Sequence, residues 1–230
     1  MPNLSKRLLT IASLVPSGAR VCDIGADHGY LSIYIAKNKN PISVITTDIN
    51  EKPLSHAKFN TQKENIKNVD LRLCDGLDGI KTGESDTFII AGMGGEVISG
   101  IIERGIVKVK DNNISLILQP TTSPEFLRKF LYKNGFEIEK EIPVFENNKL
   151  YSVMKVCFTG KIQNKSEYFY YVGLLTPETE EGSLYINKQY NRCLKCAQNL
   201  EKTESKEDYA YYKSVCDGIE EFLREFENGI

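Results

Sequence analysis

The sequence lacks the features of a membrane or secreted protein. Its 230 residues contain no uninterrupted apolar run of membrane-spanning length, and the first residues do not form a signal-peptide pattern. We therefore expect a cytoplasmic protein. The composition, 41% hydrophobic and 26% charged, is ordinary for a soluble globular chain. The length suits one medium domain with a small addition.

The cysteines do not form a zinc-binding pattern. Cys193 and Cys196 make a C-x-x-C pair, but Cys216 is the only later cysteine and no histidine follows it. A structural zinc site would therefore lack its fourth ligand. We interpret the pair as neighbours on one helix face, and we expect no metal ion.

A large excess of charge of one sign is also missing. The formal net charge is −2 at neutral pH. Residues 1–160 are slightly basic and residues 161–230 are acidic. This distribution permits RNA contact through a local patch, but by itself it does not indicate nucleic-acid binding.

What the sequence does contain is a glycine-rich turn after its first predicted strand. Residues 20–24 read as a short buried strand, and a helix is predicted from about residue 29 to 39. Between them, Gly25 and Gly29 allow a sharp turn with room for a ligand against the backbone. An ordinary strand-to-helix turn uses the same residue types, so the ligand hypothesis depends on other motifs.

The side chains of this turn do not suit a dinucleotide or a phosphate. A dinucleotide fingerprint would place glycines at positions 25, 27 and 30, where the chain has Gly25, Asp27 and Tyr30. Asp27 would repel a pyrophosphate, but it can face the ammonium group of S-adenosylmethionine. The pattern Asp23-x-Gly25-x-Asp27-x-Gly29 resembles the first motif of class I S-adenosylmethionine-dependent methyltransferases.

Two further predicted strands end in acids that suit the same cofactor. Residues 43–48 form a strand ending in Asp48, which lies 23 residues beyond Gly25, near the spacing at which a carboxylate meets ribose hydroxyls. Residues 69–74 form a strand that runs into Asp75-Gly76. The Asp75 carboxylate can accept a hydrogen bond from an adenine amino group, although a simple turn residue is the alternative.

The next two predicted strands also end in distinctive residues. Residues 87–91 are followed by Gly92-Met93-Gly94-Gly95, and residues 115–118 are followed by Gln119-Pro120. Ligands of open α/β sheets bind at the carboxyl ends of the strands. Three glycines in four positions indicate a backbone that a ligand must approach closely.

The order of elements predicts an α/β, Rossmann-like fold. A helix at 124–133 and strands at 136–145 and 149–158 complete a seven-stranded sheet of order 3-2-1-4-5-7-6, with strand 7 antiparallel. We expect this methyltransferase domain to span residues 1–160. In residues 161–230, apolar stripes over 185–200 and 212–226 predict an antiparallel helical hairpin.

With these motifs identified, the sequence resembles the bacterial tRNA adenine-22 N1-methyltransferase family. The likeness covers residues 1–160, while the tail is similar only in its position and hairpin character. The matching segments are Leu4-Ser5-Lys6-Arg7-Leu8, the turn from Asp23 to Leu31, Asp75-Gly76-Leu77, Ala91-Gly92-Met93-Gly94-Gly95 and Leu118-Gln119-Pro120. The resemblance implies that tRNA is the partner and that N1 of an adenine in its D-loop region receives a methyl group from S-adenosylmethionine.

The motifs and the resemblance together give a set of expected site residues. The expected cofactor-binding residues are Arg7, Asp23, Gly25, Asp27, His28, Gly29, Asp48, Ile49, Asp75, Gly76, Ala91 and Gly92. The expected substrate-binding residues are Met93, Gly94, Gly95, Gln119, Pro120, Lys188, Arg192 and Lys195. The last three lie at i, i+4 and i+7 of one predicted helix, so they can face the same phosphate backbone. We expect a monomer.

The residues after the fourth strand fit methylation of a ring nitrogen. Methylases of exocyclic amines carry Asn/Asp-Pro-Pro-aromatic there, whereas this chain has Ala-Gly-Met-Gly. N1 of adenine has an in-plane lone pair and needs only alignment and stabilisation of the positive charge that forms. Asp27 is our catalytic candidate for that charge. Two alternatives stay open: a methyltransferase acting on another RNA site or a small molecule, and an RNA-binding module without a cofactor.

Overall fold

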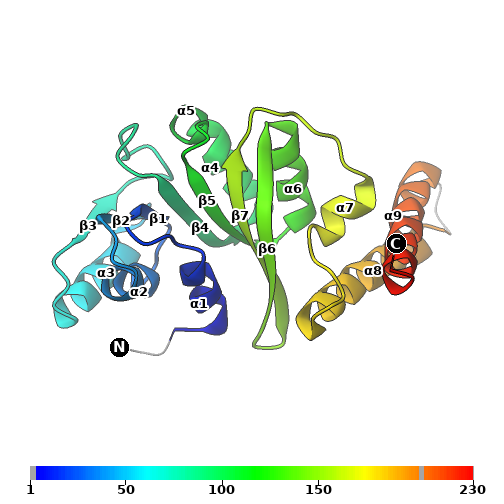
Figure 1. Cartoon of the computed structure of the whole chain (residues 1–230), viewed down its shortest axis with the longest axis horizontal. Coiled ribbons are helices and arrows are strands. Elements are labelled where there is room, and N and C mark those ends of the chain that lie inside the picture. Colours follow the sequence, from blue (N-terminus) through cyan, green and yellow to red (C-terminus); the bar gives the residue numbers. More distant parts are fainter. Residues whose placement is uncertain (1–3, 202–204, 230) are drawn as a thin grey trace.

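A computed structural model describes residues 4–201 and 205–229 of the chain (Figure 1). Its centre is one seven-stranded sheet of order β3-β2-β1-β4-β5-β7-β6. The first five strands pair in parallel, and β7 pairs antiparallel with both β5 and β6. The predicted strand order and the antiparallel seventh strand are therefore confirmed.

The strands alternate with helices along most of the chain. The strands are β1 (Arg20–Ile24), β2 (Ser43–Asp48), β3 (Val69–Leu73), β4 (Thr87–Gly94), β5 (Ser115–Thr122), β6 (Phe136–Glu146) and β7 (Lys149–Phe158). The helices are α1 (Lys6–Ser13), α2 (Tyr30–Asn38), α3 (Glu51–Lys63), α4 (Gly95–Arg104), α5 (Ile106–Val109), α6 (Pro124–Lys133), α7 (Glu167–Val172), α8 (Glu180–Leu200) and α9 (Lys206–Glu227). The sequence analysis did not identify α4, α5 or α7.

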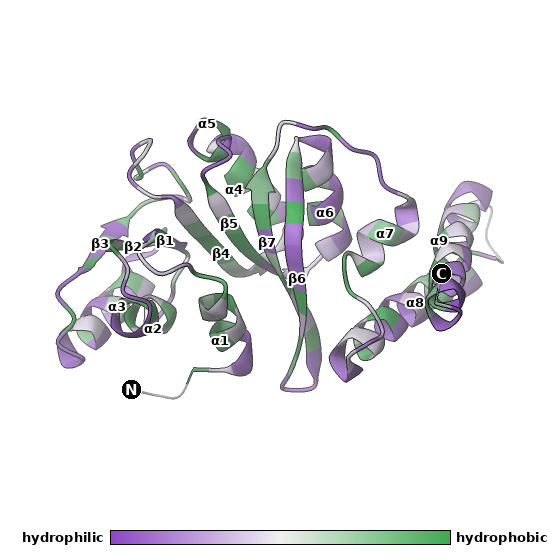
Figure 2. Cartoon of the chain, in the orientation of Figure 1, coloured by the Kyte–Doolittle hydropathy of each residue, from purple (hydrophilic) through white to green (hydrophobic). Residues whose placement is uncertain are grey.

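The sheet has a hydrophobic core on each face, because successive strand residues point to opposite sides. Val21 and Ile89 belong to the core that includes residues of α1 and α2. Cys22 and Phe88, their chain neighbours, belong to the core that includes residues of α4 and α6. The central strands consequently carry apolar residues on both faces, and much of the β4 and β5 ribbons is green in Figure 2. Helices cover the sheet on both faces, which leaves the strand ends as the place for a ligand.

The end of β4 differs from the loop that its glycines predict. The strand continues to Gly94, and Met93 and Gly94 pair with Pro120 and Thr122 of β5 through two register shifts. Gly92 has a φ of +80°, a conformation that glycine adopts without strain. The glycines therefore form a bulged strand end that stays paired with β5, and the backbone of Gly92 is exposed and open to a ligand.

The tail forms a helical hairpin that packs against the sheet domain. The Tyr190 hydroxyl of α8 donates to Glu220 of α9 at 2.5 Å, and the two helices follow each other in the chain and pack together as a hairpin. Contacts of α8 with β6 and β7, and of α7 with α6, join the hairpin to the domain. Within the described residues, none of the helices is both long and apolar enough to span a membrane.

Candidate active site

The turn after β1 places two acids and two glycines at the carboxyl edge of the sheet. Gly25 and Gly29 have φ values of +70° and +71°. A Cβ at Gly29 would lie 2.9 Å from the Cβ of Ala57 on α3, so only glycine lets these helices approach so closely. The turn is thus fixed by backbone conformation and by packing, as the glycine spacing predicted.

Asp23 is the buried acid at the end of β1. One of its carboxylate oxygens accepts a hydrogen bond of 2.6 Å from Ser32, whose hydroxyl in turn accepts from Thr46 at 2.7 Å. Burial raises the pKa of Asp23 to about 6, against a smaller lowering by the Ser32 hydrogen bond. A cationic ligand beside this carboxylate would stabilise its charged form.

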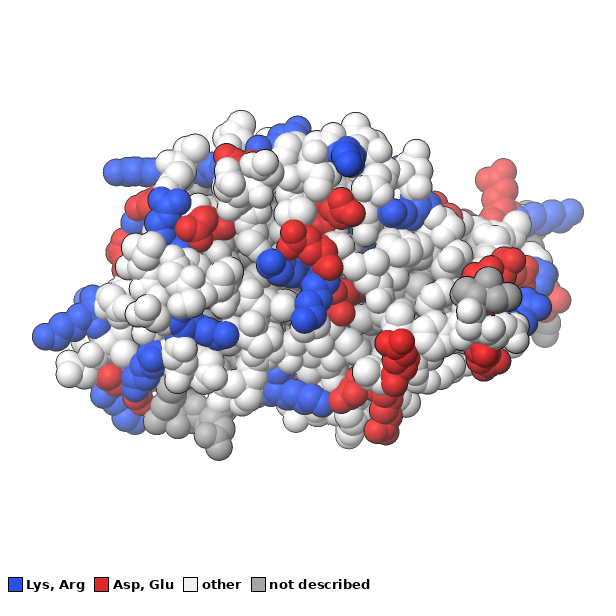
Figure 3. Space-filling view, in the orientation of Figure 1, with Lys and Arg blue, Asp and Glu red and all other residues white. Residues whose placement is uncertain are grey.

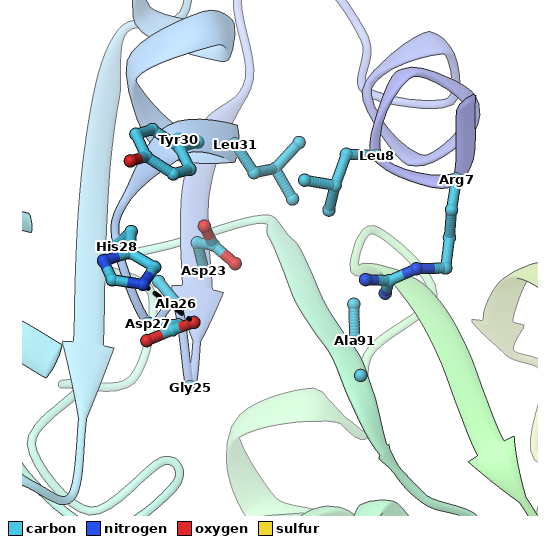
Figure 4. A pocket seen from close by; sticks show the side chains of 11 residues that line it. Arg7, Leu8, Asp23, Gly25, Ala26, Asp27, His28, Tyr30, Leu31 and Ala91 are labelled. Atoms are coloured by element: carbon cyan, nitrogen blue, oxygen red, sulfur yellow. Dashed lines mark ion pairs between the residues drawn. The ribbon is translucent and has the colours of Figure 1, made fainter. Parts of the chain in front are cut away.

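Asp23 and the turn form one wall of a cavity of about 270 Å³, which we call the Arg7 cavity. Figure 4 shows that Arg7 and Leu8 of α1 face this wall from the opposite side, with Ala91 of β4 between them. Gly92 also lines the cavity. The structure therefore brings Arg7, Asp23, Gly25, Asp27, His28, Ala91 and Gly92 of the predicted cofactor set together around one space.

Asp27 and His28 lie at the mouth of the Arg7 cavity. The Asp27 side chain is 69% exposed, and its φ of +49° is uncommon for a residue other than glycine. A carboxylate oxygen of Asp27 lies 3.7 Å from Nε2 of His28, and the His28 ring stacks on His56 with centroids 5.0 Å apart. Asp27 is thus accessible to a ligand and held in an unusual conformation.

A second cavity, of about 320 Å³, lies on the other side of Gly25, and we call it the Asp48 cavity. Asp48 is buried, and its carboxylate accepts a hydrogen bond of 2.8 Å from the Asn50 backbone N–H. The predicted residues Ile49, Asp75 and Gly76 also line this cavity. Asp75 is paired at 3.1 Å with Arg104, a contact that no sequence motif indicated.

Met93 lies between the two cavities. Its terminal methyl carbon would clash with a Cβ built on Gly25, and apart from the chain neighbours of Gly25, Met93 supplies the only described atoms within 4 Å of that position. Met93 lines the Asp48 cavity, and Gly25 lines both. The predicted substrate-binding residue Met93 therefore packs on the turn that separates the two cavities.

Gln119 is another predicted substrate-binding residue that the structure places inside the protein. Its side chain is fully buried, and its carbonyl oxygen accepts hydrogen bonds from the Arg7 guanidinium and from the Gly92 backbone N–H. The amide nitrogen donates to the Pro120 carbonyl at 2.8 Å. Gln119 therefore holds Arg7 against the bulged end of β4, and its own amide groups face other protein atoms.

The remaining predicted substrate residues lie beside or beyond this edge. Gly95 is buried with its backbone against Ser123, and Gly94 packs on Thr122. A third cavity, of about 320 Å³, lies next to them and is lined by Pro120, Lys188 and Arg192, among others; we call it the Lys188 cavity. Lys195 is exposed one turn further along α8 and does not line this cavity.

The methyltransferase domain family matches residues 4–154, which include both halves of the candidate site. The chain belongs to this methyltransferase family. A Bacillus subtilis protein named tRNA (adenine(22)-N(1))-methyltransferase is 39% identical over 152 residues, which cover 66% of this chain. That alignment spans 63% of the relative, so the chain covers less than two thirds of its length.

Solved structures extend the similarity to the tail. The crystal structure of the Bacillus subtilis tRNA methyltransferase superposes with a TM-score of 0.86 and 28% identity, covering 97% of this chain and all of that one. A Streptococcus pneumoniae structure in complex with S-adenosyl-L-methionine gives a TM-score of 0.80 and 28% identity, with 96% of this chain and all of that one covered. The resemblance inferred from the sequence motifs is confirmed by these comparisons.

The residues of this methyltransferase site fit S-adenosylmethionine. The Arg7 cavity offers carboxylates to an ammonium group and the Arg7 guanidinium to a carboxylate, as the amino-acid end of the cofactor requires. The Asp48 cavity offers a buried carboxylate to ribose and an apolar wall, including Ile49, Val97 and Ile101, to adenine. Among residues 4–201 and 205–229, no cluster of three or more His, Cys, Asp or Glu side chains could hold a metal ion.

Several residues of the site were not among those that the sequence predicted to bind a ligand. Leu8 and Leu31 line the Arg7 cavity, and Arg104 lines the Asp48 cavity from α4. Glu146, at the tip of the β6–β7 hairpin, accepts a hydrogen bond of 3.0 Å from the Arg7 backbone N–H. These residues reach the site from helices and a hairpin that are distant in sequence, so only the tertiary structure shows them.

Proposed function

We propose that this protein transfers a methyl group from S-adenosylmethionine to N1 of an adenine in the D-loop region of tRNA. The observation that supports it most is the similarity to the Bacillus subtilis tRNA (adenine(22)-N(1))-methyltransferase, which is 39% identical over 152 residues. The similarity in structure extends over the helical tail. A small-molecule substrate would not account for the helical tail that the two proteins share.

The chemistry proposed for the site depends mainly on alignment. The bound cofactor supplies an electrophilic methyl group on a sulfonium centre. Ala91 and Gly92 leave the backbone of β4 open to the edge of a base, and Gln119 holds this segment in place. The N1 lone pair lies in the plane of the ring, so it can attack once it is aligned with the methyl carbon.

Asp27 is our proposed carboxylate for the charge that forms on the base. Transfer of the methyl group leaves N1-methyladenosine with a positive ring, and a carboxylate at the mouth of the Arg7 cavity stabilises that charge. The exposed position of Asp27 leaves it accessible to a base that enters from solvent. The same side chain can instead bind only the cofactor ammonium group, and an Asp27→Asn variant with normal cofactor affinity but slow transfer would distinguish the two roles.

We expect a small group of basic side chains, and no broad basic surface, to contact the RNA. On the face shown in Figure 3, basic and acidic side chains are interspersed and do not form one broad basic surface. Lys188, Arg192 and Lys195 of α8 remain our proposed phosphate contacts from the tail. We also propose that residues 1–160 bind the cofactor and that residues 1–160 and 161–230 both contact the RNA.

The proposal is tested by mapping methylation on unmodified tRNA transcripts. We expect a reverse-transcription stop at adenine 22 that depends on both the protein and S-adenosylmethionine. A transcript with guanine at that position should show no stop and should incorporate no methyl group. Methylation at another adenine, or of small molecules only, would overturn the proposed substrate while leaving the cofactor assignment intact.

A further inference from the structure

The Lys188 cavity lies at the junction between the sheet domain and the tail. One side is formed by the end of β5 and the start of α6, and the other by Lys188, Gln189 and Arg192 of α8. Leu150 and Tyr151 of β7 form its floor. Pro120, Lys188 and Arg192 of this lining are among the expected RNA contacts, but neither the sequence motifs nor the proposed reaction chemistry assigns a particular nucleotide to the space.

The Lys188 cavity is in direct contact with the candidate active site at two places. The Arg7 guanidinium, which lines the Arg7 cavity, lies 5.7 Å from the centre of the Tyr151 ring, which lines the Lys188 cavity. The backbone of Gly94 packs on the Thr122 side chain, which also lines the Lys188 cavity. A polymeric substrate with one residue bound in the candidate active site could therefore place the adjacent residue in the Lys188 cavity.

The charged groups of this cavity favour an anion at Lys188. Arg192 is already paired with Glu125, so its charge is largely compensated. The Lys188 ammonium donates to the Leu150 carbonyl at 3.3 Å. Its pKa is lowered, first by burial and then by the nearby cations Arg192 and Lys149, and a bound anion would offset both effects.

We propose that the Lys188 cavity binds the nucleotide adjacent to the target adenosine in the RNA, with a phosphate at Lys188 and the base against Tyr151. The inference rests on the proposed function and names a second subsite for the same substrate. It differs from a general electrostatic surface because it assigns one phosphate and one base to named side chains.

The energetics of base extrusion explain why such a subsite is useful. A base that enters the active site must leave its stack, which exposes the neighbouring base as well. Aromatic side chains of RNA-binding proteins commonly replace the lost stacking of unpaired bases. Tyr151 is half-buried and rigidly placed in β7, so its ring can serve this purpose without much loss of conformational entropy.

The phosphate contact is tested with Lys188→Gln in the full-length chain. We expect the dissociation constant for an unmodified tRNA transcript to rise roughly tenfold at moderate salt, as for loss of one charge-assisted hydrogen bond. The slope of log affinity against log salt should fall by about one, and the affinity for S-adenosylmethionine should not change. Lys188→Arg, which keeps the charge, should restore most of the tRNA affinity.

A matched control separates the Lys188 contact from the general effect of removing one positive charge from the tail. Lys213 lies on α9, is exposed and pairs with Asp217, so Lys213→Gln removes the same charge from the same tail. We expect this variant to bind tRNA within about twofold of the wild type. Equal losses for Lys188→Gln and Lys213→Gln would overturn the subsite and favour a general electrostatic attraction.

The base contact is tested by comparing Tyr151→Phe with Tyr151→Ala. Stacking needs the ring and not the hydroxyl, so the phenylalanine variant should keep its KM for tRNA while the alanine variant should show a rise of roughly tenfold. Loss of affinity in the phenylalanine variant would contradict stacking. If the wild type neither binds nor methylates tRNA, the proposed function and the subsite both fail; if it methylates tRNA and the Lys188 and Tyr151 variants match it, only the subsite fails.

Discussion

Asp23 shows how a single residue couples the candidate cofactor site to pH. Its pKa is about 6 in the folded chain and 3.8 in the unfolded reference state, because burial penalises the charged form. Between about pH 4 and pH 6 the folded state therefore holds this proton more tightly than the unfolded chain. The free energy of unfolding falls as pH rises through this range, and Asp23 continues to destabilise the fold above pH 6.

The prediction for Asp23 concerns the variant Asp23→Asn, which cannot acquire a buried charge. We expect it to be more stable than the wild type at pH 8, by up to about 3 kcal/mol on the scale of 1.36 kcal/mol per pKa unit. At pH 4 the two should be nearly equal. Urea unfolding at both pH values measures the difference, and a gap that does not depend on pH would show that Asp23 does not titrate in this way.

Met93 is the second residue with a specific expected effect. A cofactor that extends from the Asp48 cavity to the Arg7 cavity must pass over Gly25, where the Met93 methyl carbon lies. The side chain must therefore move, which its unbranched thioether permits at modest cost. We expect Met93→Ala to lower the dissociation constant for S-adenosylhomocysteine several-fold in calorimetry. Met93→Leu keeps the bulk and should not improve binding; a weaker ligand affinity in the alanine variant would contradict this role.

The sequence predicted these site residues unevenly. Asp23, Asp48 and Asp75 could be identified because each lies at or just after the end of a predicted strand, and parallel strands bring their carboxyl ends to one edge. The roles of Gln119 and Met93 could not, since burial of the first and packing of the second on Gly25 depend on contacts across the sheet. A motif indicates which residues lie near a site, whereas their partners show what each one does.

At the scale of elements, α1 is held over the active site by the sheet domain. Its N-terminal turn has donors without partners inside the helix. Ser5 accepts from the Leu8 N–H at 3.4 Å, and Glu146 accepts from the Arg7 N–H at 3.0 Å. The hairpin tip therefore caps the helix that carries Arg7.

This arrangement predicts local opening of α1 in Glu146→Ala. Loss of a hydrogen bond to a charged group costs about 1.5–3 kcal/mol. Hydrogen exchange within residues 6–13 should therefore become at least roughly tenfold faster, with the central strands unaffected. Glu181→Ala provides the control, because it removes only an exposed ion pair between α1 and α8. Equal exchange in both variants would mean that the Glu146 contact does not hold the helix.

Helix α7 was missed in the sequence for a physical reason. Helix α7 has six residues, Glu167–Val172, which is too short for a helical period of apolar residues to be visible. The carbonyl oxygens of Tyr170 and Tyr171 accept hydrogen bonds from buried Arg128, so tertiary contacts fix this turn. The long, strongly periodic helices and the apolar strands were predicted because their pattern is local.

At the scale of the whole molecule, the domain and the tail share a buried ion pair. Arg128 of α6 and Glu141 of β6 have fully buried side chains with N and O atoms 2.6 Å apart. Arg128 also contacts the Tyr185 hydroxyl at 3.1 Å, and Glu141 accepts from the Leu174 N–H at 3.0 Å. The pair thus joins the sheet domain to residues on both α7 and α8 and fixes the position of the hairpin.

The last prediction follows from the cost of an unpaired buried charge. Arg128→Met leaves the Glu141 carboxylate without its cation, so we expect a loss of about 3–5 kcal/mol in the free energy of unfolding. The double variant Arg128→Met/Glu141→Leu removes both charges and should be less destabilised than Arg128→Met alone. Lys129→Met removes the neighbouring cation, whose pair with Glu167 is partly exposed, and should cost less than about 1 kcal/mol. Denaturant unfolding of the wild type, the single variants Arg128→Met, Glu141→Leu and Lys129→Met, and the double variant measures these differences. A double variant destabilised by the sum of the Arg128→Met and Glu141→Leu losses would show that the two buried charges do not stabilise each other.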